Sequence, residues 1–354
     1  MTREADFPVA VKEALAKRAD NRCSFPQCPQ ATIGPSEEGP EKISNSGDAA
    51  HIVAASSGPG ARRANKNGLS PDQLKDIDNG IWMCATHARL IDRDEVTYTI
   101  PMLQLWRRIR EQKAKLRQQL GREIEFGPAR FADLPLVEDE IKLNGVGSEN
   151  ETIGNAFLNS CVHEIWGKEL AEAVRDLSIE LVRNAFEHGH ATEFTLSIES
   201  KRIVLSDNGK PFHYEDILNQ QRKRGGAAAI QRLLDYHSSH VVLAPVHRGV
   251  GNELTIALIH RPDDIPEVTS CFHRFTERDI KAHTRSLPSL SGCDKTYLIL
   301  PNFLTFSDAF NFAAFLKRNQ FDPKKYIIVA QGLSDGVIKT CRNELPDCQI
   351  MVLP

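Results

Sequence analysis

Hydrophobic spacing predicts two helices in the first third of the chain. Apolar residues recur at helical intervals over residues 8–20. Leu103, Trp106 and Ile109 share one face of a second, cationic segment from Met102 to Arg122, which contains no proline. We therefore expect a short helix near the N-terminus and a long basic helix before residue 125.

Other patterns predict the structure of the segments between these two helices and after them. The Gly/Ser/Pro-rich stretch from Ile33 to Gly47 predicts a loop, and the short apolar run AAHIVAAS predicts a strand. Residues 126–150 hold glycine, proline and acidic pairs with little periodicity, which predicts a linker.

From Thr152 onward the pattern predicts helices packed on a sheet. Five apolar residues repeat at the spacing of one buried helix face: Leu170, Val174, Leu177, Leu181 and Ala185. The runs TEFTLSIES and RIVLSD predict two strands, GAAAIQRLLDYH a helix, and HVVLAPV and NELTIALIH two further strands.

The last sixty residues alternate between strand and helix patterns. TYLILP, a helix over 307–318, KYIIVA, a helix from Asp335 to Glu344 and QIMVL give the order β-α-β-α-β, a small α/β unit. The chain as a whole is thus predicted to be a multidomain α+β protein. Its predicted parts are domains at 1–125, 151–265 and 295–354, joined by linkers at 126–150 and 266–294.

Composition limits the environment and the partners. Hydrophobic residues make up 41% of the 354 residues and charged residues 26%, and no apolar run is long enough to span a bilayer. The N-terminal residues MTREADFPVAVKEALAKRAD lack an apolar signal core, so we predict a cytoplasmic protein without membrane contact. The net charge of −3 means that any nucleic-acid binding must come from local clusters of cations.

Cysteine and histidine spacing predicts one metal site. Four residues separate Cys23 from Cys28, and two separate Cys84 from His87, so each pair can bind one ion from a single turn. Three thiolates and one imidazole fill a tetrahedral shell, which predicts structural zinc. The other five cysteines are scattered and are predicted to be reduced thiols: Cys161, Cys271, Cys293, Cys341 and Cys348.

The residues between the two ligand pairs resemble the HNH endonucleases over about residues 8–106. The matching motifs are Asp48-Ala49-Ala50-His51-Ile52-Val53 and Asn79-Gly80-Ile81-Trp82. The resemblance implies a ββα-metal fold in which His51 deprotonates the attacking water and Asn79 fixes the loop that positions it.

Two positions depart from the HNH pattern. Members that cleave carry ligands of the catalytic magnesium where this chain has Ala50 and Ala88, and alanine offers no lone pair. Asp48 or Asp92 could substitute. Both a cleaving nuclease and a module that only binds DNA therefore stay open.

Two groups of cations are candidates for nucleic-acid contact. They are Arg62, Arg63 and Lys66 in a loop, and Arg107, Arg108 and Arg110 at the start of the long basic helix. Such runs can follow the phosphate backbone of DNA, although a solvated helix face explains many of them.

A second set of motifs resembles the GHKL superfamily of histidine kinases, anti-sigma-factor kinases, gyrase-type ATPases and mismatch-repair ATPases. Glu180 and Asn184 lie four residues apart on one helix face, and a strand ends at Asp207-Asn208-Gly209. The resemblance implies an α/β sandwich that binds ATP. Asn184 would hold magnesium, Asp207 would accept from the adenine amino group, Gly209 would let the base approach, and Glu180 would activate water.

The phosphate-binding part of this pattern is shorter than usual in the superfamily. Gly225 and Gly226 open a predicted helix whose amides could meet phosphate, and Gly251-Asn252-Glu253-Leu254-Thr255 stands where the last motif would be. The alternative is that Glu180 and Asn184 form a solvated face and that Asp207-Asn208-Gly209 is a simple turn.

These resemblances together predict an HNH-type DNA endonuclease module controlled by a GHKL ATPase, a pairing that suits bacterial anti-phage defence. One alternative is a nuclease-dead DNA sensor with a nucleotide switch. Another is an anti-sigma-type serine kinase whose C-terminal domain is STAS-like. Homo-oligomers and a protein partner for the C-terminal domain also stay open.

Overall fold

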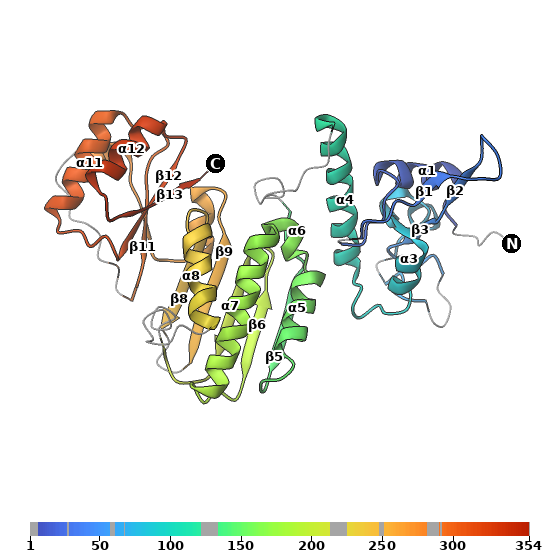
Figure 1. The fold of residues 1–354 in the computed structure, drawn as a ribbon, viewed down its shortest axis with the longest axis horizontal. Coiled ribbons are helices and arrows are strands. Elements are labelled where there is room, and N and C mark those ends of the chain that lie inside the picture. Colours follow the sequence, from blue (N-terminus) through green and yellow to red (C-terminus); the bar gives the residue numbers. More distant parts are fainter. Residues whose placement is uncertain are drawn as a thin grey trace. The chain divides into compact units, whose positions relative to one another are not determined.

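The computed structural model describes residues 6–26, 28–56, 61–66, 68–121, 134–212, 225–247, 251–281, 290 and 292–353. Contacts divide the chain into two compact units. Unit 1 comprises Met1–Val137 and Leu158–Ile165, and unit 2 comprises Glu138–Phe157 and Trp166–Pro354. Both contain helices and sheets, as Figure 1 shows, which confirms the α+β class at this level.

Unit 1 is built around a two-stranded antiparallel sheet. Its strands β3 (Gly47–His51) and β4 (Gly80–Cys84) pair directly, and every residue of β4 is buried. Helix α1 (Val9–Arg18) packs Leu15 and Ala16 against Trp82 of β4. The remaining elements are β1 (Ile33–Pro35), β2 (Ile43–Asn45), α2 (Pro71–Leu74), η1 (Ile77–Asn79), α3 (Ala85–Ile91) and α4 (Ile100–Leu120).

Two outcomes in unit 1 bear on the sequence predictions. Helix α4 forms where the basic helix was expected: Thr99 caps its start, and Gly121 ends it with a left-handed φ of 66°. The loop predicted at Ile33–Gly47 instead contains the β1–β2 hairpin. Strands this short and largely exposed leave no alternation for a sequence pattern to reveal.

Unit 2 contains a five-stranded antiparallel sheet with the order β5-β6-β7-β9-β8. Its strands are β5 (Asp139–Leu143), β6 (Phe194–Ile198), β7 (Arg202–Asp207), β8 (Val241–His247) and β9 (Asn252–Leu258). Helices α5 (Glu149–Asn159), α7 (Lys168–Glu187) and α8 (Gly225–His237) cover one face, as seen in Figure 1. The short helix α6 (Val162–Trp166) precedes α7. The predicted apolar stripe of α7 is fully buried.

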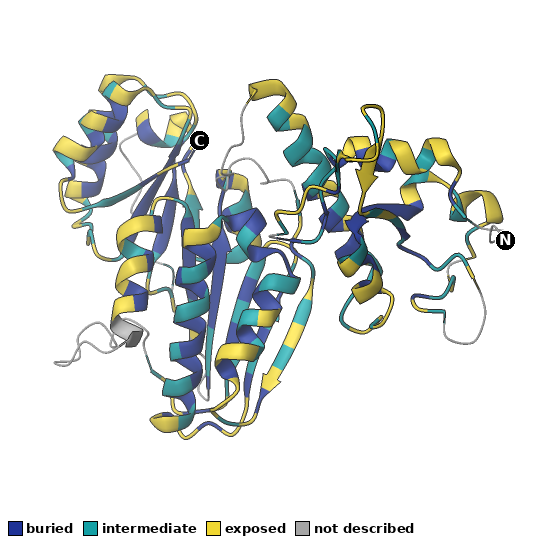
Figure 2. Cartoon of the chain, turned by 45° about the vertical axis from the view of Figure 1, so that its right-hand side comes forward, coloured by how far each residue is buried: buried dark blue, intermediate teal, exposed yellow. Residues whose placement is uncertain are grey.

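A parallel four-stranded sheet packs on the other face of this antiparallel sheet. Its order is β10 (Phe272–Arg274), β11 (Thr296–Ile299), β12 (Tyr326–Gln331) and β13 (Gln349–Leu353). Val242 and Ala257 of the antiparallel sheet share a core with Ile299 and Val329 of the parallel one. Figure 2 shows these strands as largely buried. Helices α10 (Glu277–Lys281), α11 (Phe306–Arg318) and α12 (Asp335–Glu344) cover the opposite face.

Both predicted linkers contain regular structure. β5 and the first residues of α5 lie within 126–150, whereas η4 (Pro262–Asp264), α9 (Ile265–Val268), β10 and α10 fill most of 262–281. Both strands are short edge strands, so their sequences carry little apolar signal. Cys271 and Cys293 form a disulfide, so the prediction of reduced thiols is wrong for these two, whereas Cys161, Cys341 and Cys348 are free.

Among the described residues, none of the helices combines the length and the apolar character needed to cross a membrane.

Candidate functional site

The four predicted metal ligands meet in unit 1. The ligand atoms of Cys23, Cys28, Cys84 and His87 all lie within 4.8 Å of one another. Cys84 ends the buried strand β4, and His87 lies in the first turn of α3. The Nδ1 atom of His87 is 3.2 Å from Sγ of Cys84 and 3.4 Å from Sγ of Cys23. The fold thus brings the two distant sequence pairs into one cluster.

The chemistry of this cluster suits a divalent cation. Burial, together with the nearby sulfurs of Cys28 and Cys84, raises the pKa of Cys23 to about 12, so a cation is needed to hold the Cys23 sulfur as a thiolate. Burial lowers the pKa of His87, which favours the neutral imidazole that binds metal. Three sulfurs and one nitrogen form a set that could hold zinc in a closed, structural site.

His51 and Asn79 lie at adjoining ends of the β3–β4 pair. His51 is the last residue of β3 and pairs with Gly80, and its ring stacks on Phe7 with 3.9 Å between centroids. The Asn79 side chain accepts from the amide of Val53 at 2.8 Å and donates to its carbonyl at 3.0 Å and to that of Leu74 at 3.1 Å. Because Asn79 is buried and bonded in this way, it fixes the loop after His51 and cannot contact a substrate.

Arg63 is buried between the end of β3 and the end of α3. Its buried guanidinium donates to the carbonyls of Ile52 at 2.9 Å and Ile91, and to the Asp92 carboxylate at 2.9 Å. Arg63 was predicted to contact nucleic acid. The structure corrects this prediction, because a side chain 3% exposed cannot reach a phosphate.

Neither acid proposed as a substitute metal ligand suits that role. Asp92 is already paired with the Arg63 guanidinium. Asp48 and Ala50 share one face of β3, and His51 lies on the other, because side chains alternate along a strand. Ala50 and Ala88 are both buried. The described residues around His51 therefore do not fit a catalytic divalent cation.

The other predicted nucleic-acid contacts divide by exposure. Arg107 is held by Glu111 at 2.9 Å and by the Ile77 carbonyl at 2.7 Å, and only 12% of its side chain is exposed. Burial lowers the pKa of Arg110, whose Nε atom is enclosed. Arg107 thus ties α4 to η1, and Arg110 is largely enclosed, so the structure does not support the predicted contact of either with nucleic acid. The exposed cations are Arg62, Lys66 and Arg108.

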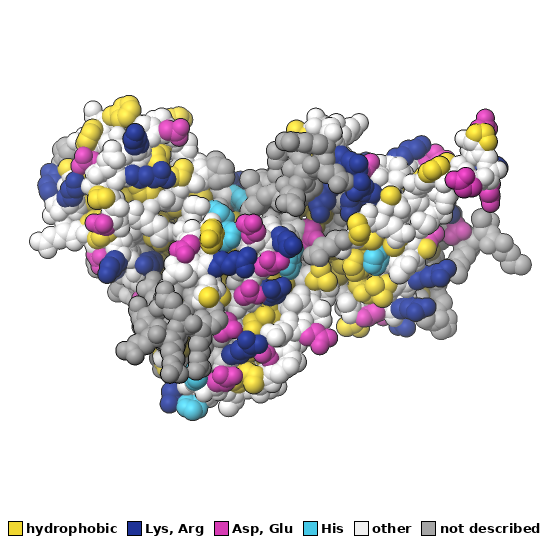
Figure 3. All heavy atoms as spheres, in the orientation of Figure 1, with side chains coloured by type: hydrophobic (Ala, Val, Ile, Leu, Met, Phe, Trp, Pro, Cys, Tyr) yellow, Lys and Arg dark blue, Asp and Glu magenta, His cyan; other side chains and the backbone are white. Residues whose placement is uncertain are grey.

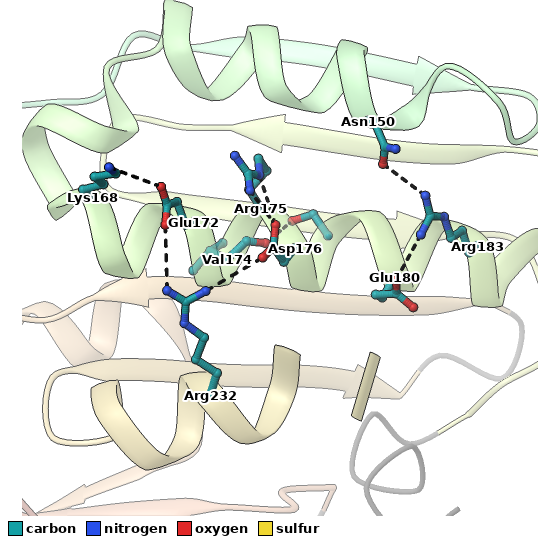
Figure 4. Close-up of polar contacts among 10 residues, drawn as sticks. Asn150, Lys168, Glu172, Val174, Arg175, Asp176, Glu180, Arg183 and Arg232 are labelled. Carbon is teal, nitrogen blue, oxygen red and sulfur yellow. Dashed lines mark hydrogen bonds and ion pairs between the residues drawn. The ribbon is translucent and has the colours of Figure 1, made fainter. Parts of the chain in front are cut away.

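In unit 2, the last turns of α7 carry Glu180 and Asn184, both half-buried. Glu180 pairs with Arg183 at 3.1 Å, and Arg183 also contacts Asn150 of α5, as Figure 4 shows. Arg183 contacts Glu149 of α5 as well. The Asn184 carbonyl accepts from the amide of Gly189 at 2.9 Å, which closes the end of the helix.

Asp207 ends β7 and organises the loop that follows. Its carboxylate accepts from the amide of Gly209 at 2.7 Å and from Nδ2 of Asn252 at 3.0 and 3.2 Å. Burial raises the pKa of Asp207, although these hydrogen bonds oppose the rise. Asn252 also donates to the Lys210 carbonyl at 3.0 Å and accepts from the Phe212 amide at 2.8 Å. Asn252 belongs to the Gly251–Thr255 motif of the sequence analysis, but no role was predicted for it.

Three glycines let the loops at this end of unit 2 approach closely. A Cβ atom on Gly209 would lie 2.9 Å from the Gly189 carbonyl oxygen. Gly251 has φ of +77°, and a Cβ there would lie 2.3 Å from the Asp207 carbonyl oxygen. The Gly251 amide donates to the Gly209 carbonyl at 3.1 Å. The ends of α7 and β7 and the start of β9 are therefore tied together.

A cavity of about 240 Å³ opens beside this group. It is bordered by Glu193, Thr195, Ser206, Asp207, Asn208, Asn252 and Glu253. Gly225 and Gly226 are the first residues of α8, and the preceding segment 213–224 lies outside the described residues. The predicted phosphate-binding turn is therefore described only from Gly225 onward.

Comparisons with known proteins identify no relative of this chain. No family model, curated protein or solved structure matches the chain. The HNH and GHKL resemblances rest on the residues themselves: the Cys₃His cluster, His51 and Asn79 in unit 1, and Glu180, Asn184 and Asp207 in unit 2.

Proposed function

We propose that this protein is a nucleotide-dependent DNA-binding protein. Unit 1 is an HNH-like module that zinc stabilises and that binds DNA without cutting it, and unit 2 is a GHKL-like module that binds and hydrolyses ATP. The position of Arg63 carries the choice of binding over cleavage. Its guanidinium is buried and bonded to Asp92, so an acid that could have replaced the missing metal ligands is already paired.

The charge of Arg63 and the absence of metal ligands at Ala50 and Ala88 both favour a module that does not cleave DNA. A cleaving site needs a divalent cation to offset the charge that builds on the phosphate. Ala50 and Ala88 supply no donor atom, and the fixed positive charge of Arg63 both neutralises Asp92 and repels a second cation. His51 and Asn79 then serve the architecture of the module.

Exposed cations of unit 1 support DNA binding. Arg62, Lys66 and Arg108 are exposed, and Figure 3 shows dark-blue basic side chains grouped over α4. Lysine and arginine on a surface bind phosphates largely by releasing condensed counterions from DNA. Binding of this kind is sequence-tolerant and falls steeply with salt.

Asp207 and the end of α7 support nucleotide binding. The Asp207 carboxylate is held rigidly by Asn252 and Gly209, and a fixed acceptor of this kind suits an exocyclic amino group. Glu180 and Asn184 lie on one face of α7 and supply a carboxylate for water activation and an amide oxygen for magnesium.

The first experiment asks whether unit 1 cuts or only binds. Full-length protein is incubated with plasmid and Mg²⁺ or Mn²⁺ and examined for both cleavage and retarded mobility, beside His51→Ala. We expect retardation without cleavage for both proteins. Cleavage by the wild type that His51→Ala abolishes would overturn the non-cleaving module.

Titrating salt then tests the cations. Lys66→Ala should weaken binding and reduce the slope of log affinity against log salt by about one phosphate contact. Lys12→Ala removes an exposed lysine of α1 outside the predicted contacts and is the matched control. Equal slopes for Lys66→Ala and the wild type would show that Lys66 does not contact a DNA phosphate.

The second experiment tests the nucleotide site. Asp207→Asn should weaken ATP binding roughly tenfold or more, the scale of a hydrogen bond to a charged group. Asp347→Asn, an exposed acid near β13, is the control. Unchanged affinity in Asp207→Asn would mean that the site is misassigned. With γ-labelled ATP, free phosphate supports an ATPase, whereas label on protein would favour the kinase alternative.

A further inference from the structure

Arg183 connects the proposed catalytic carboxylate to a neighbouring helix. Its guanidinium reaches three oxygen atoms at once: Glu180 at 3.1 Å, Glu149 at 3.0 Å and Asn150 at 3.1 Å. Figure 4 shows Arg183 on α7 directed toward Asn150, with Glu180 on the same helix turned toward Arg183. One side chain thus ties Glu180 to the first turn of α5.

The contact with α5 is better fixed than the contact with Glu180. The Glu149 side chain is 7% exposed and also accepts from the Gly147 amide. Burial alone would raise the pKa of Glu149, but the hydrogen bonds from Gly147 and Arg183 hold it below its usual value, so Glu149 stays ionised. Glu180 is 24% exposed and bonds Arg183 through one oxygen. The weaker contact is therefore the one to Glu180.

We propose that Arg183 is a positioning residue that restrains Glu180, and that displacement of α5 releases Glu180 to activate water. This proposal rests on the proposed ATPase function. A carboxylate acts as a general base through a free, oriented lone pair, and a guanidinium bonded to it both occupies an oxygen and offsets its charge. While Arg183 stays bonded to Glu180, one carboxylate oxygen of Glu180 is occupied and cannot accept a proton from water.

The chain on either side of α5 suggests what displaces it. Glu149–Phe157 belongs to unit 2, whereas the segment that follows, Leu158–Ile165, packs within unit 1. Helix α5 therefore carries the anchor for Arg183 at one end and continues into unit 1 at the other. A rearrangement of unit 1 when DNA binds would be passed along this helix to Arg183, so DNA would stimulate ATP hydrolysis.

The test uses full-length protein and measures turnover of ATP and affinity for a fluorescent ATP analogue. Arg183→Gln should raise kcat about two- to fivefold, the scale of a partly exposed ion pair, while affinity for the analogue stays the same. Glu149→Gln keeps the shape of the anchor but loses its charge, so Arg183 should stay with Glu180 when α5 moves, and DNA should stimulate this variant less than the wild type. Adding DNA should stimulate the wild type and have little effect on Arg183→Gln.

Arg175→Gln is the matched control. Arg175 lies on the same helix but pairs with its neighbour Asp176 at 2.8 Å, and Figure 4 shows it upstream of the Glu180 pair. We expect it to leave kcat unchanged. The double variant Glu180→Gln/Arg183→Gln should not show the increase in kcat, because the Glu180 carboxylate that the loss of Arg183 would release is absent.

The outcomes separate the two proposals. A fall or no change in kcat for Arg183→Gln, with wild-type affinity intact, would overturn the restraint and leave the ATPase in place. Failure of the wild type to bind the analogue would overturn the nucleotide site itself. Thermal unfolding of each variant shows whether a change in kcat merely reflects lost structure.

Discussion

At the scale of single residues, the two arginines of unit 1 that look most like DNA contacts are the ones that hold the module together. Arg63 has a left-handed φ of 53° and gives its guanidinium to carbonyls at the ends of β3 and α3. Arg107 similarly joins α4 to the Ile77 carbonyl. A buried guanidinium offers several N–H donors in a fixed geometry. It can therefore donate to buried carbonyl oxygens that have no partner within a helix or a sheet.

Arg63→Met should therefore destabilise unit 1. Removing the guanidinium leaves the carbonyls of Ile52 and Ile91 buried without their donor, which costs about 2–4 kcal/mol. Urea unfolding followed by tryptophan fluorescence measures the change, since Trp82 and Trp106 are both buried in unit 1. Arg62→Met, at the exposed neighbour, should shift the midpoint little; equal shifts would contradict the structural role of Arg63.

The contrast between the zinc ligands and Arg63 shows what sequence can predict at this scale. Cys84 and His87 are three positions apart, so local spacing alone predicts that they can share one metal ion. The bonding of Arg63 depends on Ile91 and Asp92, nearly thirty positions away, and no local pattern encodes it. The same holds for Asn252, whose bond to Asp207 spans 45 positions.

At the scale of elements, the long helices were predictable because each presents a full apolar face, as α7 does. The strands β5 and β10 were missed because each is a short edge strand with exposed positions. The contacts that join elements could not be predicted either. In the sequence, Gly251 is typical of any turn, and only the structure shows its close approach to Asp207.

Gly251→Ala should disrupt the group of loops around Asp207. The new Cβ would meet the Asp207 carbonyl oxygen at 2.3 Å in a left-handed backbone, so the loop must move. We expect a loss of about 2 kcal/mol or more in the stability of unit 2, together with weaker nucleotide binding. Gly121→Ala, at φ of +66° with open space around it, isolates the backbone strain and should cost less. Equal costs for both would argue against close approach at Gly251.

The turn between α8 and β8 should make unit 2 sensitive to acid. Burial, and then the neighbouring His237 and His260, lower the pKa of His240. Burial also lowers the pKa of His237, which Glu169 opposes and Arg232 reinforces. Because the folded state favours neutral rings, their contribution to stability is present above the unfolded pKa of about 6.5 and is lost as pH falls below it.

Thermal unfolding between pH 7.5 and 5 measures this loss. The unfolding temperature of unit 2 should fall across the window in the wild type and fall less in His240→Gln, which cannot be protonated there. His190→Gln changes an exposed histidine in the loop after α7 and should retain the wild-type profile. A flat wild-type profile would show that the two rings do not titrate differently on folding.

At the scale of the whole molecule, the two candidate sites draw on separate cores. All four candidate metal ligands belong to unit 1, and Glu180, Asn184 and Asp207 belong to unit 2. A bound metal ion would add folding free energy to unit 1, whose described sheets have two strands each, whereas the described sheets of unit 2 have four and five strands. The units should therefore respond to different ligands.

Calorimetry of the full chain tests this division. We expect two unfolding transitions, of which a chelator lowers one and a non-hydrolysable ATP analogue raises the other, because a ligand stabilises only the unit that binds it. Cys84→Ser should act on the first transition as the chelator does, and Cys348→Ser, outside the cluster, should leave that transition in place. A chelator that abolished analogue binding would show instead that the two units fold as one. If the division holds, coupling between DNA and ATP needs a link between the units, and α5, which begins in unit 2 and ends in unit 1, is one such segment of the chain.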